Sequence, residues 1–148
     1  MEDIEETQML AERWEGDRIK WIKWMLLGFM LWDGARISEK YLFPGQYEFV
    51  LAPMIAIGTI IWMVGMLKLS QLSKLLKKNK QLNIILNDEM IVLHRLKAFT
   101  TGFYALVATQ VLIQFISYSH PFSSILAADI SIFVGVVSAG VAFIVYHR

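Results

Sequence analysis

The chain of 148 residues contains no cysteine. This absence excludes disulfide bonds, metal sites held by thiolates and cysteine nucleophiles. The sequence also lacks a Gly-rich phosphate loop, a nucleophile elbow and a zinc-binding histidine pair. It therefore offers no support for an enzyme, and we expect no cofactor.

A metal site is equally poorly supported. Asp88, Glu89 and His94 come closest to a ligand set, but their spacing does not put the acids and the histidine on one helix face. A further ligand is missing as well. We therefore expect no bound metal.

The chain has almost no net charge, because 14 lysines and arginines oppose 13 aspartates and glutamates. We therefore expect no direct contact with nucleic acid, and the placement of the charges is more informative than their sum. The first residues are acidic and have no apolar core, so we expect no cleaved signal peptide.

Long apolar segments dominate the rest of the chain, which is 56% hydrophobic and too apolar for an ordinary soluble domain. Residues 49–67 and 98–119 each contain no charge. Segments of about 20 such residues are long enough to cross roughly 30 Å of hydrocarbon as a helix. Two membrane crossings are therefore the firmest prediction.

Two further crossings complete an all-α, four-helix membrane bundle in one domain. Trp21 and Trp24, interleaved with cations, are typical of a membrane boundary and open a crossing with a polar outer half. An in-plane amphipathic helix is the alternative for this first segment. The predicted parts are an N-terminal segment (1–20), four crossings (21–43, 47–67, 98–118 and 123–146) and a helical hairpin (68–97) between the second and the third.

Lysine and arginine are distributed unevenly about these crossings. The predicted hairpin and the N-terminal segment carry most of them, whereas only Arg36 and Lys40 lie on the other side. Basic segments are retained in the cytoplasm. We therefore expect both termini and the hairpin to be cytoplasmic.

The hairpin and the N-terminal segment suggest a surface for a protein partner. Residues 1–17 predict a short surface helix, or a partly frayed acidic tail, that Gly16 interrupts. The apolar patch in the hairpin must be covered by something. The candidate partner surface consists of Leu82, Ile84, Ile85 and Leu86 with Lys77, Lys78 and Lys80. This is the basis for a regulatory or scaffold function.

Asp129 is the single charge within the fourth crossing, where a carboxylate must be neutral, paired or hydrated. It is either a proton or cation site, or a structural residue that pairs with Arg36 or forms hydrogen bonds near Ser123, Ser124 and Ser131. The candidate polar site consists of Asp129, Arg36, Asp33, Gln110 and Gln114. A functional site here would indicate a small oligomeric transporter or channel, whereas helix-packing hydrogen bonds are the simpler interpretation.

Ser131, Gly135 and Ala139 recur at four-residue spacing in the fourth crossing. Small residues in this pattern let another backbone approach closely. The partner is the first or third crossing, a second copy of the chain, or another subunit of a larger membrane complex.

One stretch resembles a segment found in a group of small bacterial membrane proteins with four helices. The resemblance depends on Leu86, Asn87, Asp88, Glu89, Arg95, Lys97, Ala98 and Gly102. Such proteins are often encoded beside helix-turn-helix transcription regulators, which implies a membrane partner of a regulator. The group usually has an arginine nearer the acids, where this chain has Met90. The resemblance implies no catalytic residue.

Overall fold

A computed structural model describes residues 2–78, 89–117 and 123–146. All of the secondary structure in these residues is helical, which confirms the predicted all-α class. The elements are α1 (Glu2–Ile37), the π-helical turn η1 (Ser38–Leu42), α2 (Glu48–Lys78), α4 (Glu89–Ser117) and α5 (Ser124–Tyr146).

The predicted interruption at Gly16 is wrong, because α1 is one continuous helix of 36 residues. A glycine inside a helix costs only about 1 kcal/mol relative to alanine, so it weakens a helix without ending it. The chain reverses direction after η1, at Gly45, whose φ of 72° suits a residue without a side chain.

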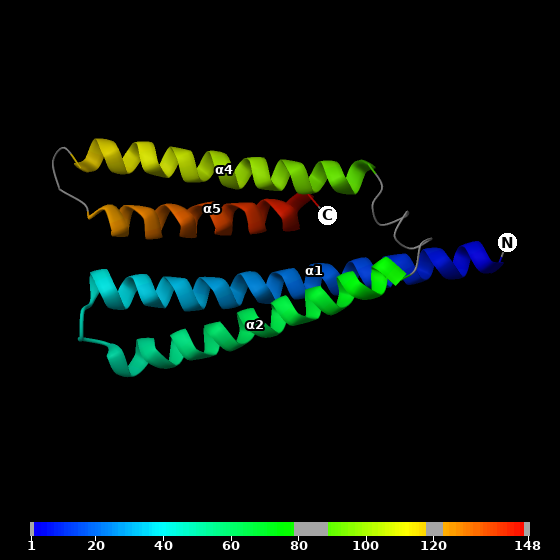
Figure 1. Ribbon diagram of the computed structural model, residues 1–148, viewed down its shortest axis with the longest axis horizontal. Coiled ribbons are helices and arrows are strands. Elements are labelled where there is room, and N and C mark those ends of the chain that lie inside the picture. Colours follow the sequence, from blue (N-terminus) through cyan, green and yellow to red (C-terminus); the bar gives the residue numbers. More distant parts are fainter. Residues whose placement is uncertain (1, 79–88, 118–122, 147–148) are drawn as a thin grey trace.

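The helices form two antiparallel pairs that lie side by side, α1 with α2 and α4 with α5 (Figure 1). The start of α1, the end of α2, the start of α4 and the end of α5 lie at one end of the bundle. Beyond the end of α5, the start of α4, the end of α2 and the start of α1 all continue, and α1 projects furthest. The two helix pairs meet mainly where α1 contacts α5.

Glycines bring the backbones of α1 and α2 into direct contact. A Cβ built on Gly28 would lie 2.5 Å from the backbone nitrogen of Trp62, and one on Gly58 would clash with the backbone nitrogen of Trp32. Two turns further along α2, Gly65 lies against Met25. Such contacts are typical of helix packing in membranes, where small residues permit close approach.

The small-residue face of α5 packs on α4. A Cβ on Gly102 of α4 would lie 2.6 Å from the Cβ of Ala139 and 2.7 Å from the carbonyl oxygen of Gly135. Ser131, the third member of this face, is only 1% exposed. Among the alternatives left open by the sequence, the partner of this face is therefore the helix that contains the third crossing.

Three helices are long and apolar enough to cross a membrane: 48–74, 91–117 and 124–146. Their outer faces carry large exposed apolar side chains, including Phe49 at 93% and Phe99 at 75% exposure. This inverted distribution is typical of a bundle whose solvent is lipid. α2 extends to Lys78, whereas residues 79–88, with most of the predicted hairpin patch, lie outside the described residues.

The glycine contacts give a matched prediction. Gly58→Ala should lower the free energy of unfolding by about 1–3 kcal/mol, because the new methyl group meets backbone that cannot move aside. Gly16→Ala should instead stabilise α1 by up to about 1 kcal/mol, since nothing lies within 4 Å of that position. Thermal unfolding in detergent micelles measures both, and equal effects of the two variants would contradict the packing described above.

Candidate functional site

A cluster of charged and hydroxyl groups lies at the end of the bundle remote from the two termini. Asp33 and Arg36 stand one turn apart on α1, so their side chains meet. The Nε of Arg36 donates a hydrogen bond of 2.9 Å to Oδ1 of Asp33, and its Nη2 lies 2.7 Å from the same oxygen. Asp33 is 3% exposed, so Arg36 compensates a buried charge.

The same guanidinium group joins α1 to α5. Nη2 of Arg36 donates to Oδ1 of Asp129 at 3.1 Å, and the hydroxyl of Tyr41 donates to Oδ2 of Asp129, also at 3.1 Å. Lys40 is close enough to act electrostatically on Asp129. Both carboxylate oxygens of Asp129 therefore have donors.

Tyr41 is the member of this cluster that sequence reasoning missed. It lies in η1, where i→i+5 hydrogen bonding widens the last turn of the helical path. In this position its hydroxyl reaches Asp129 on a different helix. From the sequence, an aromatic residue beside the predicted membrane boundary indicates an interfacial anchor. Nothing in the spacing of Tyr41 indicates a hydrogen bond to α5.

Aromatic rings extend the cluster toward the centre of the bundle. Arg36 lies 5.9 Å from the ring of Trp32, which stacks on Trp62 of α2 at 5.7 Å. Phe29 stacks on Phe133 of α5 at 6.0 Å. Arg36 thus contributes to a contact network that holds α1, α2 and α5 together.

The remaining members of the predicted polar site lie elsewhere. Gln110 and Gln114 belong to α4, and no hydrogen bond joins them to Asp129 in the part of the chain that the structure describes. Thr109 and Ser131 each bond a carbonyl one turn earlier in their own helix. These two hydroxyl groups therefore bond within their own helices and do not extend the cluster at Asp129.

The structure describes only part of the candidate partner surface. Leu82, Ile84, Ile85, Leu86 and Lys80 lie outside the described residues, and Lys77 and Lys78 form the last two positions of α2. At the same end of the bundle, the projecting part of α1 exposes Met9 (66%) and Leu10 (40%). Within the described ranges, no group of three or more histidine or acidic side chains could hold a metal ion.

The cluster predicts unequal effects of its members on stability. Arg36→Gln should cost about 3–5 kcal/mol of unfolding free energy, because it leaves the buried carboxylate of Asp33 without its cation. Tyr41→Phe should cost about 1 kcal/mol, since it removes one hydrogen bond from Asp129. Denaturant titration in mixed micelles compares the two, and a smaller loss for Arg36→Gln than for Tyr41→Phe would contradict the arrangement.

Comparisons with protein-family models, with curated proteins and with solved structures returned no match for this chain. The geometry offers two features from which a function can be inferred. One is the cluster of Asp33, Arg36 and Asp129, whose charges are paired with one another and which joins α1 to α5. The other is the projecting end formed by α1 and α2 (Figure 1).

Proposed function

We propose that the protein crosses a membrane four times, with α1 as the additional crossing. Among the described helices, α1 is not one of those that are apolar enough by composition, and Asp33 and Arg36 interrupt its apolar half. Asp33 and Arg36 are paired with each other, and Arg36 also reaches Asp129. Charges compensated inside a bundle are compatible with a membrane environment, whereas charges facing lipid are not.

The end that carries both termini is cytoplasmic in this proposal, and the membrane is a bacterial inner membrane. Arginines and lysines gather there on all three helices that reach beyond the apolar segments, as the positive-inside rule requires. They are Arg13, Arg18, Lys20, Lys23, Lys68, Lys74, Lys77, Lys78, Arg95 and Lys97. Among the lysines and arginines that the structure describes, Arg36 and Lys40 alone lie at the opposite end.

At this cytoplasmic end the protein acts as a regulatory or scaffold protein that binds a protein partner. The supporting observation is the length of α1: its 36 residues span about 54 Å, against about 35 Å for the 23 residues of α5. The first part of α1 projects beyond the ends of α2, α4 and α5 (Figure 1). Exposed Met9 and Leu10 beside acidic residues give the projection an apolar surface with a charged rim, as in protein interfaces.

The chemistry of the partner follows from the resemblance noted in the sequence. Small membrane proteins of that group are encoded beside helix-turn-helix regulators, so a transcription regulator is the partner that we propose. The predicted hairpin would contribute the rest of the surface. Contact with nucleic acid would then be made by the partner.

A small oligomeric transporter with a site at Asp129 is the second candidate, and docking as an accessory subunit is the third. The transporter requires a carboxylate that exchanges its ligands. Asp129 has Arg36 and Tyr41 as donors, and this pairing favours a packing role. The small-residue face of α5 is occupied by α4, so it does not favour docking to a further subunit.

Sidedness can be tested cleanly because the chain has no cysteine. In spheroplasts, a membrane-impermeant maleimide should label Glu48→Cys and leave Lys74→Cys unlabelled until the membrane is permeabilised. Both positions are exposed, so access to the reagent depends on the membrane alone. The reverse pattern would contradict the proposed orientation.

Partner binding can be tested with a photo-crosslinking amino acid at Met9 in living cells. We expect one discrete protein adduct at Met9 and none at Phe49, an equally apolar exposed position at the opposite end. The adduct should disappear when Leu10→Asp is introduced, because a charge there disrupts an apolar contact. Adducts of the same proteins at both positions, or none at Met9, would count against a partner-binding end.

A further inference from the structure

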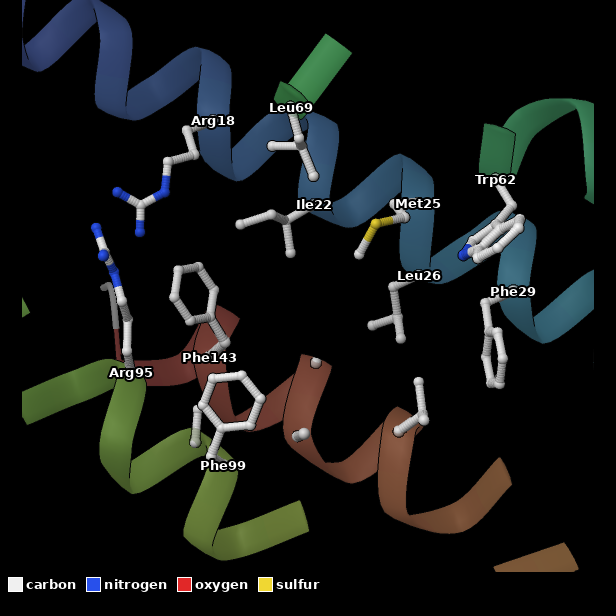
Figure 2. A pocket seen from close by; sticks show the side chains of 14 residues that line it. Arg18, Ile22, Met25, Leu26, Phe29, Trp62, Leu69, Arg95, Phe99 and Phe143 are labelled. Atoms are coloured by element: carbon white, nitrogen blue, oxygen red, sulfur yellow. The ribbon is translucent and has the colours of Figure 1, made fainter. Parts of the chain in front are cut away.

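An apolar groove of about 410 Å³ lies between the two helix pairs and is lined by α1, α2, α4 and α5 (Figure 2). Its walls are formed by aliphatic and aromatic side chains, among them Ile22, Leu26 and Phe29 of α1. It reaches the surface of the bundle, because the lining residues Phe99 and Val136 are 75% and 42% exposed. The volume is in the range of about 300–1,000 Å³ that is usual for sites of small ligands.

Two arginines close one end of this groove. Arg18 comes from α1 and Arg95 from α4, and their guanidinium groups point toward one another (Figure 2). The ring of Phe143 lies under Arg18 at 5.6 Å and orients it. An arginine keeps its charge under physiological conditions, so this end of the groove is a fixed pair of cations.

The electrostatics of the arginine pair favour an anion. Burial lowers the pKa of Arg18, and the positive charge of Arg95 lowers it further. Glu15 raises the same pKa and offsets part of this repulsion. A phosphate within reach of both guanidinium groups would interact favourably with both charges, because guanidinium binds phosphate through paired hydrogen bonds.

The position of the arginines matches the headgroup level of the membrane. Arg18 precedes the boundary tryptophan Trp21 by three residues, and Arg95 precedes the apolar segment that begins at Ala98 by three residues. Three residues of helix span about 4.5 Å, so both arginines lie just outside the hydrocarbon on the same side. Basic pockets between membrane helices at this level bind anionic headgroups.

The shape of the groove selects an acyl chain over a helix. A helix about 10 Å wide fills roughly 400 Å³ with a single turn of 5.4 Å, so the groove is too small for a helix from a second copy. An empty apolar groove facing lipid would forfeit dispersion contacts, and such sites are dry. A flexible hydrocarbon chain is narrow enough for the groove and restores these dispersion contacts without water.

We propose that this groove binds an anionic glycerophospholipid, with the phosphate held between Arg18 and Arg95 and one acyl chain lying along Leu26, Phe29 and Phe99. The lipid fills the space between the two helix pairs and joins them at the cytoplasmic end, as the Asp129 cluster does at the other end. The inference depends on α1 crossing the membrane and is independent of any protein partner.

Native mass spectrometry of the full chain, released from micelles containing phosphatidylglycerol, tests the proposal. Wild type should retain one phosphatidylglycerol, and Arg18→Gln with Arg95→Gln should weaken its binding about tenfold or more, since charge-assisted hydrogen bonds are lost. Arg13→Gln with Lys20→Gln is the matched control, because both residues are exposed cations at the same end that do not line the groove. Equal retention by the two double variants would overturn the proposal.

Two further sets of measurements distinguish lipid binding from the binding of other ligands and from misfolding of the variants. Val136→Trp should block the groove and reduce retention, whereas Val141→Trp, exposed on the same helix outside the groove, should not. Arg18→Lys with Arg95→Lys keeps the charges and should retain more lipid than the glutamine variant. Retention of phosphatidylcholine equal to that of phosphatidylglycerol, or displacement of the lipid by inorganic phosphate alone, would also overturn the proposal.

Discussion

A charge inside hydrocarbon has to find its partner within the protein, because no water is present to solvate it. In the proposed arrangement with α1 as a crossing, Arg36 meets this constraint. It neutralises Asp33 on its own helix and reaches Asp129 on α5. The charges that make α1 unlike the other helices are thus the ones that attach it to them. An apolar α1 would have no such reason to lie beside α5.

The rest of the structure consists of two closely packed pairs with a looser junction. Gly28 and Gly58 join α1 to α2, and Gly102 joins α4 to α5 with backbones in contact. Between the pairs, side chains make the contacts instead: the Asp129 cluster at one end, stacked Phe29 and Phe133 in the middle. Toward the end that carries both termini the pairs leave the groove open. The proposed lipid would fill this space between them.

The three apolar helices were predictable because a membrane crossing is a property of a continuous segment, read from length and composition alone. The tight packing at Gly135 and Ala139 followed equally from their four-residue spacing. Gly16 was misjudged because a glycine penalty of about 1 kcal/mol is small beside the stability of a helix this long.

Features that combine residues from distant parts of the chain were harder to predict. The sequence allowed a pair between Arg36 and Asp129 as one of several possibilities, but gave no sign that Tyr41 would complete it. Arg18 and Arg95 each belong to an ordinary run of boundary cations, and only the assembled bundle brings them to one groove. Such sites depend on the mutual rotation of helices, which no periodicity within one helix specifies.

The central claim is that α1 passes through the bilayer and does not lie in its surface. It can be tested most directly by measuring the depth of nitroxide labels at Lys23, Leu27, Met30 and Lys40, all exposed positions, in liposomes. The account predicts low exposure to a water-soluble nickel relaxant and high exposure to oxygen at Leu27 and Met30, with the opposite balance at Lys23 and Lys40. One shallow depth shared by all four labels would contradict it.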